Sequence, residues 1–353
     1  MSSAKPRVLM LIPSVAKTDL AEAVRTDTHP TMDYHALQAK WNADILDYAA
    51  LNAEQNPILV KLARKAGRDA ALAMAGYLRR RDYDIIYSNG ENVSIPLAIL
   101  LKRHRVRPRH VLIGHHLSTG KKKPFFRALH SEMDAIFVYA STQQTYGMQE
   151  LGIPKAKLPL IPFHADHRFY RCLPASSNAP PQMICSAGLE WRDYPTMLDA
   201  VKGLDFEVRL AAASPWSKHQ NETASRTLPP NVSARRYSYH ELRQLYADSQ
   251  FVVVPLYEND FQAGITTILE AMACGKAVIT SKTVGQVDTI ADGKNGLYVP
   301  PGDSEALRAA ITHLLDNPKE AARLGANART FIEETATLDH WVKNIIAFSN
   351  ALL

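Results

Sequence analysis

The residues best suited to chemistry lie in one stretch of the chain, residues 251–281. Residues 251–256 and 277–280 are apolar and rich in β-branched side chains, which is typical of buried strands in a parallel sheet. Between them the pattern predicts a loop and then a helix. Such a loop lies at the carboxyl edge of the sheet, where the helix presents unpaired N–H groups, so we expect this turn to bind a phosphate. The turn consists of Gly264, Ile265, Thr266 and Thr267.

Glu270 follows this turn and has two interpretations. The run Thr267-Ile268-Leu269-Glu270 fits the S/T-x-x-E capping box that begins a helix, and Gly275 would end that helix. Alternatively, the carboxylate accepts hydrogen bonds from the two hydroxyl groups of a ribose, as acidic residues do in nucleotide-binding folds. The spacing alone leaves both roles open.

Two further polar side chains lie near predicted strand ends. Arg192 follows the strand end at 186–188 and precedes a helix, so its planar guanidinium could hold a phosphate. The alternative is an ordinary surface arginine. Gln262 lies in the loop before Gly264, where it could bond a sugar hydroxyl or be an exposed loop amide of no special role.

A pair of histidines, His115 and His116, directly follows the predicted strand 111–113. This position places them at the carboxyl edge of a sheet and toward a cleft. A lone histidine is usually structural, but two at a strand end also fit a ligand or proton-transfer role.

The secondary-structure elements that position these residues follow a repeated order: an apolar strand, a polar loop and an amphipathic helix. In the first half, strands are predicted at 7–12, 84–87, 111–113 and 135–138, with helices at 96–102 and 142–151. After a breaker-rich linker at 174–181 there follow strands at 183–187 and 207–211, helices at 196–201 and 240–246, and a C-terminal helix at 339–353. We therefore expect an α/β protein of two doubly wound, Rossmann-like domains whose parallel sheets face each other across a cleft.

The composition favours a cytoplasmic globular protein. Cys172, Cys185 and Cys274 are odd in number and match neither a zinc-site spacing nor a disulfide framework, so we expect reduced thiols. The apolar run 8–12 is too short for a signal peptide and is better interpreted as a first strand. No segment approaches the roughly 20 apolar residues that span a bilayer.

Charge is unevenly divided along the chain. Residues 1–170 hold 24 Lys and Arg against 15 Asp and Glu, whereas residues 171–353 hold 17 against 20. The surplus gathers at 79–81, 102–110 and 121–123. Such clusters either attract anionic lipid head groups, which would place the protein peripherally on the inner face of a membrane, or are solvated helix ends and loops. Nucleic acid is the less favoured partner because the clusters lack interleaved aromatic residues.

The stretch QAGITTILEAMACGKAVI at 262–279 resembles the signature of retaining glycosyltransferases of the GT-B fold, family four. In that family a Glu-x7-Glu motif leads into L-E-A-M-A-x-G-K-P-V-I. Weaker similarities follow the family's order along the chain, at 161–166, 187–192, 285–288, 292–296 and 301–303.

This resemblance implies a hexosyltransferase that retains anomeric configuration, needs no metal ion and uses a nucleotide-diphosphate sugar as co-substrate rather than a bound cofactor. Residues 1–170 would form the acceptor side, 171–336 the nucleotide-sugar domain, and 337–353 a helix crossing back to the first domain. The implied donor contacts are the turn at 264–267 with sugar and diphosphate, Glu270 with the ribose and Arg192 with a phosphate. Gln262 would stand where the first Glu meets the donor sugar, and His116 or His115 where a histidine contacts the sugar. The acceptor, a lipid or a polysaccharide, stays open.

The sequence also departs from the family pattern. Gln262 replaces a glutamate, Leu189 stands where the family often has arginine, Asp288 replaces Glu, and a glycine-rich loop is absent from 13–17. These departures leave two alternatives: a nucleotide-sugar epimerase of the same fold, and a non-catalytic protein that binds a nucleotide sugar.

Overall fold

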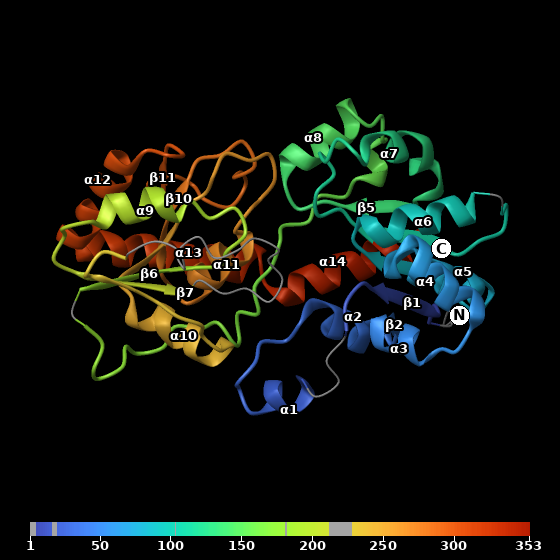
Figure 1. The fold of residues 1–353 in the computed structure, drawn as a ribbon, viewed down its shortest axis with the longest axis horizontal. Coiled ribbons are helices and arrows are strands. Elements are labelled where there is room, and N and C mark those ends of the chain that lie inside the picture. The colour runs from blue at the N-terminus through green and yellow to red at the C-terminus, as the bar shows by residue number, and fades with distance from the viewer. Residues whose placement is uncertain (1–4, 16–19, 103, 181, 212–227) are drawn as a thin grey trace. The chain divides into compact units, whose positions relative to one another are not determined.

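The computed structural model describes residues 5–15, 20–102, 104–180, 182–211 and 228–353, and within them the chain forms two compact units (Figure 1). Predictions that involve Ala16, Lys17, Arg103 and Pro181 lie outside this part. The first unit comprises Met1–Leu20, Met32–Pro162 and Trp341–Leu353, and the second comprises Ala21–Thr31 and Phe163–His340. The division falls after Pro162, whereas the sequence placed it after residue 170.

The first unit is built on a five-stranded parallel sheet in the order β2-β1-β3-β4-β5. Its strands are β1 (Val8–Ile12), β2 (Asp44–Asp47), β3 (Ile85–Asn89), β4 (Arg109–Ile113) and β5 (Ala135–Phe137). Its helices are α2 (Asp33–Trp41), α3 (Tyr48–Ala53), α4 (Pro57–Ala66), α5 (Arg68–Leu78), α6 (Glu91–Leu101), α7 (Lys123–Leu129) and α8 (Ser141–Gln149). Helix α14 (Leu338–Asn350) begins in the second unit, and its residues from Trp341 onward belong to the first.

The second unit contains a six-stranded parallel sheet in the order β11-β10-β9-β6-β7-β8. Its strands are β6 (Met183–Ala187), β7 (Glu207–Ala211), β8 (Val232–Ala234), β9 (Phe251–Val254), β10 (Ala277–Ser281) and β11 (Leu297–Val299). Its helices are α1 (Leu20–Arg25), α9 (Tyr194–Val201), α10 (Tyr239–Asp248), α11 (Ile265–Ala273), α12 (Ser304–Asp316) and α13 (Pro318–Thr335). Of α1, only the first residue, Leu20, belongs to the first unit. The expected α/β fold with two parallel sheets is confirmed.

Strand β9 shows why its sequence is apolar throughout. Successive strand side chains point to opposite faces of a sheet. Val252 packs in one core cluster with Ile268 of α11, and Val253 packs in another with Ile311 of α12. Because helices cover both faces, every position of the strand is buried, and an alternating polar pattern would be destabilising.

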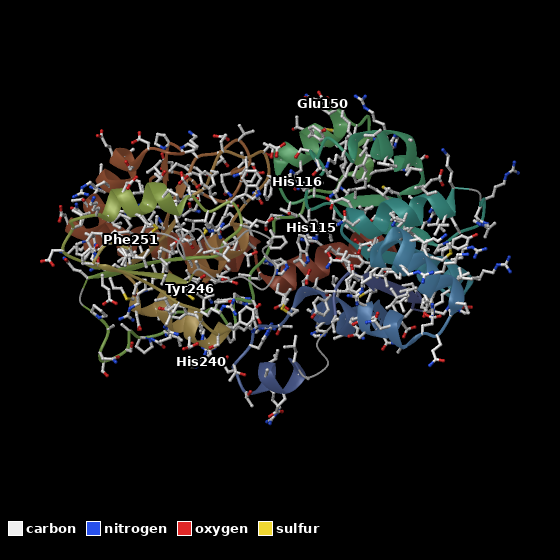
Figure 2. All side chains as sticks on the ribbon, viewed as in Figure 1. His115, His116, Glu150, His240, Tyr246 and Phe251 are labelled. Carbon is white, nitrogen blue, oxygen red and sulfur yellow. The ribbon has the colours of Figure 1, made fainter. Side chains whose placement is uncertain are left out.

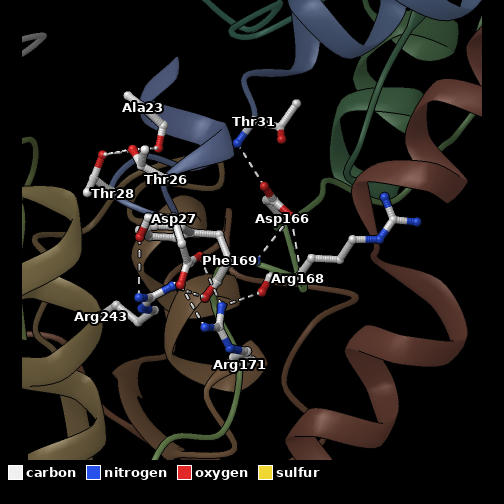
Figure 3. A network of polar contacts seen from close by, with 10 residues as sticks. All are labelled: Ala23, Thr26, Asp27, Thr28, Thr31, Asp166, Arg168, Phe169, Arg171 and Arg243. Carbon is white, nitrogen blue, oxygen red and sulfur yellow. Dashed lines mark hydrogen bonds and ion pairs between the residues drawn. The ribbon is translucent and has the colours of Figure 1, made fainter. Parts of the chain in front are cut away.

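The segment Ala21–Thr31 packs in the second unit, although it lies between β1 and α2 in the sequence. Asp27, in the left-handed region at φ 57°, bonds Arg171 at 2.7 Å and Arg243 at 2.8 Å (Figure 3). The Thr31 backbone N–H donates to Asp166 at 2.7 Å. Hydrogen bonds from the two arginines hold the pKa of Asp27 well below its usual range. This attachment had no counterpart in the sequence analysis.

We expect Asp27→Asn to loosen this segment. The Arg243 side chain is almost fully buried and would lose its carboxylate partner, so the free energy of unfolding should fall by about 1–2 kcal/mol at neutral pH. Since the folded-state pKa of Asp27 is depressed, its contribution is present above the unfolded pKa of about 3.9 and disappears as pH falls through the folded value. Limited proteolysis at 21–31 and thermal melting measure the change. Glu22→Gln, which removes an exposed pair with Arg25 in α1, is the control and should change neither.

Among the described residues, no helix combines the length and apolar character needed to cross a membrane.

Candidate functional site

Helix α11 begins at a glycine that the local geometry requires. Gly264 is its N-cap, with φ 75°, and Ile265 is its first helical residue. A Cβ at Gly264 would lie 2.9 Å from Arg192 Nη1 and 3.0 Å from Val254 Cγ1, so the backbone approaches both closely. The predicted capping box is therefore wrong, because the helix begins earlier than Thr267. The first backbone N–H groups of α11 have no partner within the helix, as at any helix start.

Arg192 is the buried cation of this region. Its Nε donates to Ala187 O at 2.8 Å, Nη1 to Glu190 O at 2.8 Å, and Nη2 to Thr267 Oγ1 at 3.0 Å. The side chain is only 6% exposed, so the surface-arginine alternative is wrong. Burial lowers its pKa from the ordinary arginine value.

Arg192 has no direct ion pair within the described part of the chain, and only more distant charges such as that of Glu270 offset the cost of burying it. Each terminal nitrogen of a guanidinium carries two hydrogens. Nη1 and Nη2 therefore each keep one N–H beyond the hydrogen bonds to Glu190 and Thr267. The neighbouring Gly188 (φ 91°) leaves room for the guanidinium, since a Cβ there would lie 2.5 Å from Nη2. An anion at this place would meet a fixed cation and a helix amino end together.

Glu270 lies in the second turn of α11 and is buried. The Tyr246 hydroxyl donates to its Oε2 at 3.0 Å. Burial raises the pKa of Glu270 to about 7, against the lowering effects of the Tyr170 and Tyr246 hydroxyls and of the Arg192 charge. The side chain is thus a carboxyl group near its midpoint at neutral pH. Its proposed ribose contact stays a prediction.

Gln262 is also buried, so the interpretation as an exposed loop amide is wrong. Its Nε2 donates to Val287 O at 2.7 Å, and this bond joins the loop after β9 to the loop after β10. The Gln286 amide donates to Ala263 O across the same pair of loops. Oε1 of Gln262 is buried and has no hydrogen-bond partner within the described structure. It is an acceptor available to a hydroxyl group.

His115 and His116 lie in the first unit directly after β4, at the carboxyl edge of its sheet, as expected. The ring Nε2 of His115 lies 3.0 Å from Asn89 Oδ1, and the His116 backbone N–H donates to Glu91 Oε1 at 2.6 Å. Both side chains are half-buried. The remaining predicted site residues belong to the second unit.

Sequence reasoning missed Glu91 and Tyr246. Glu91 is a buried carboxylate at the first position of α6 that also pairs with Lys122 at 3.2 Å. Desolvation opposes its ionisation, but the charges of His115 and Lys122 keep its pKa below the ordinary value. The signal available was an acidic residue just after Gly90 at a strand end, a common place for a helix start. For Tyr246, the sequence contained no pattern that predicted its contact with Glu270, because a tyrosine on the apolar face of α10 is expected in the core.

Among the described residues, no three His, Cys, Asp or Glu side chains come together in a metal-binding arrangement.

Comparison with known proteins finds a family model that matches this region of the chain. The model of the family described as "Glycosyl transferases group 1" matches residues 201–331, which contain β9, α11 and β10. This region of the chain is thus similar to that family. The sequence resemblance to family four of the glycosyltransferases is thereby confirmed.

Two relatives show how far the similarity extends. An uncharacterized glycosyltransferase of Methanocaldococcus jannaschii is 29% identical over 136 residues, 38% of this chain and 38% of that protein. An MMP alpha-(1->4)-mannosyltransferase of Mycolicibacterium hassiacum is 23% identical over 289 residues, 74% of this chain and 68% of that protein. The match thus spans well under half the length of the first relative.

Solved structures match over nearly the whole chain. Anabaena HepE in complex with UDP-glucose has a TM-score of 0.70 at 18% identity, covering 99% of this chain and 100% of that one. Sucrose-phosphate synthase from Thermosynechococcus elongatus has a TM-score of 0.73 at 18% identity, covering 98% and 99%. At this identity the likeness establishes the fold, and the fold is GT-B.

Proposed function

We propose that this protein transfers a hexosyl group from a nucleotide-diphosphate sugar to a hydroxyl acceptor, with retention of anomeric configuration and without a metal ion. The observation that carries the proposal is Arg192, a buried guanidinium with no carboxylate partner in the described chain, fixed beside the start of α11. A diphosphate is an anion whose two charges suit this pairing of a cation with the amino end of a helix.

The proposed chemistry follows from where negative charge develops. As the glycosidic bond to the diphosphate breaks, the leaving oxygen gains charge, and the Arg192 guanidinium with the amino end of α11 stabilises it. These groups are held in place before reaction by Ala187, Glu190 and Thr267, so little reorganisation is needed. The leaving phosphate itself can accept the acceptor's proton.

The remaining predicted residues take binding roles in this proposal. Glu270 accepts hydrogen bonds from the ribose hydroxyls, and Gln262 offers its unpaired Oε1 to a hydroxyl of the donor sugar. His115 and His116 belong to the acceptor-side unit and contact the transferred sugar. Residues 171–336 then bind the donor, which is consistent with the family match at 201–331.

The acceptor is proposed to be a lipid or a polysaccharide. The basic first half of the chain favours a peripheral location of the protein at the inner face of a membrane, where it would bind anionic lipid. Nucleic acid is not proposed as a partner. UDP-glucose is bound by the HepE structure, and we include it as a donor to be tested.

Incubation with a panel of nucleotide sugars tests the proposal. UDP-glucose, UDP-N-acetylglucosamine and GDP-mannose are each incubated with the protein, and nucleoside diphosphate release and sugar products are measured. Release, as slow hydrolysis or as transfer to added membrane extract, is expected for one donor. A new sugar epimer without release would instead identify an epimerase, and binding without turnover a non-catalytic binding protein.

A further inference from the structure

We propose that the amino-end edge of the first unit's sheet is the surface by which this protein binds an anionic lipid bilayer. A cavity of about 560 Å³ opens there. Its lining includes the side chains of Arg7, Arg80, Arg81, Arg107 and Arg109 and, among the described residues, one acidic side chain, that of Asp84. The inference rests on the membrane-binding part of the proposed function, which it assigns to one surface, and not on the proposed glycosyl transfer. Vesicle binding can be measured without turnover, so a failure of one proposal is distinguishable from a failure of the other.

The strand positions show which edge of the sheet carries this cavity. Arg7 directly precedes β1, Asp84 directly precedes β3, and Arg109 is the first residue of β4. His115 follows the other end of β4, so the cavity and the histidines lie at opposite edges of one sheet. Figure 1 shows the C-terminal end of the chain near α5 at this end of the unit, and Figure 2 shows nitrogen-tipped side chains projecting from it.

The arginines of this edge are unequally neutralised. Arg107 and Arg109 both pair with Asp134, and Arg7 lies 4.0 Å from Asp84.

Arg80 instead lies over the Tyr77 ring at 4.1 Å and donates to a backbone carbonyl. Arg81 is exposed, and neither it nor Arg80 has an ion pair among the residues that the structure describes. These two guanidiniums, with the exposed Arg105 of the adjoining loop, supply the surplus positive charge. A layer of lipid phosphates complements that charge.

Exposed aliphatic side chains accompany the charge. Val106, which lines the cavity, is 94% exposed, and Leu78 ends α5 immediately before the arginines at 79–81. Ile58 and Val60 are more than half exposed at the start of α4. That start lies near the end of α5, because Glu54 just before α4 pairs with Arg79 just after α5 at 2.9 Å.

Aliphatic tips among arginines favour a bilayer over the other anionic partners. Inserted side chains bury apolar area at the boundary between head groups and acyl chains while guanidiniums stay at the phosphates. A soluble phosphate would use the charge and leave Val106 and Ile58 in water. Single-stranded nucleic acid would need stacking surfaces, and the exposed apolar residues named at this edge are aliphatic.

Vesicle flotation of the full chain tests the proposal. Vesicles of phosphatidylcholine alone are compared with vesicles in which half the lipid is phosphatidylglycerol. We expect binding to the anionic vesicles only, weakened as salt is raised because the charges are exposed. Inorganic phosphate at equal ionic strength should compete no better than chloride. Strong competition by phosphate would indicate a small-anion site and overturn the lipid assignment, as would absence of vesicle binding.

Two sets of variants locate the surface. Arg81→Glu with Arg105→Glu reverses two exposed charges that make no ion pair within the described chain, and should weaken binding roughly 30-fold or more. Val106→Asp should weaken it separately. The control, Arg236→Glu with Lys319→Glu, reverses two exposed positive charges on the second unit, the same change in net charge, and should leave vesicle binding unchanged. Equal loss in the control, or unchanged binding in the edge variants, would overturn the location. Thermal melting checks that every variant is folded.

Discussion

Arg192→Met is expected to lose nucleoside diphosphate binding by about 100-fold or more. Methionine keeps much of the side-chain volume but removes both remaining terminal N–H groups, and charge-assisted hydrogen bonds are worth about 1.5–3 kcal/mol each. It also removes the arginine donor from the carbonyls of Ala187 and Glu190, of which Ala187 O keeps a long hydrogen bond from Thr267 Oγ1 at 3.5 Å. Calorimetric titration with UDP, GDP and ADP measures the loss.

The controls separate binding from folding. Arg236→Met removes an exposed arginine of the same unit and should bind like the wild type. Arg192→Lys keeps the charge without the planar fork, so it should retain only part of the affinity. If Arg192→Met melts normally and binds all three nucleotides like the wild type, the phosphate role of Arg192 is excluded.

Glu270 is expected to make both stability and nucleotide affinity depend on pH. Its folded pKa, raised to about 7 by burial, exceeds that of a free glutamate, so between about pH 4.5 and 7 the unfolded chain has released a proton that the folded chain keeps. Stability should therefore be highest below this window and fall by about 3 kcal/mol as pH rises through it. Glu270→Gln, which can still accept from Tyr246, should abolish this contribution.

Nucleotide affinity should change with pH in the opposite sense. The ribose hydroxyls favour the ionised carboxylate as acceptor, so wild-type affinity should rise toward neutral pH, by up to about tenfold per unit below the pKa. The Gln variant should bind more weakly and with a flat profile. Denaturant unfolding and nucleotide titration from pH 5 to 8 measure both properties. Parallel profiles for wild type and variant would show that Glu270 neither carries the buried proton nor contacts the ribose.

The core strands of both sheets were predictable because burial on both faces leaves continuous apolar runs. Strands β6 and β7 were predicted with the bounds observed. The edge strands β2, β8 and β11 were not predicted, since they are short and partly exposed and their apolar runs are broken. Helix α6 was predicted from Pro96 onward, yet it begins at Glu91 and contains Pro96 beyond its first turn, where proline is less usual than at a helix start.

The site was predictable where one local pattern determined it. The turn at Gly264 and the position of Arg192 just after a strand followed from the sequence pattern near strand ends, and the phosphate role of Arg192 stays a prediction. Burial of Arg192, Gln262 and Glu270 did not, because it depends on contacts between residues far apart in the sequence, such as Thr267 with Arg192. The capping box failed for a related reason: Gly264, with its positive φ, could begin the helix earlier than Thr267.

A crystal structure with a bound nucleoside diphosphate tests the central claim most directly. The account predicts the diphosphate at the amino end of α11 within hydrogen-bond distance of an Arg192 terminal nitrogen, with the ribose hydroxyls at Glu270. A nucleotide bound elsewhere on the second unit, with Arg192 contacting only protein atoms, would contradict it.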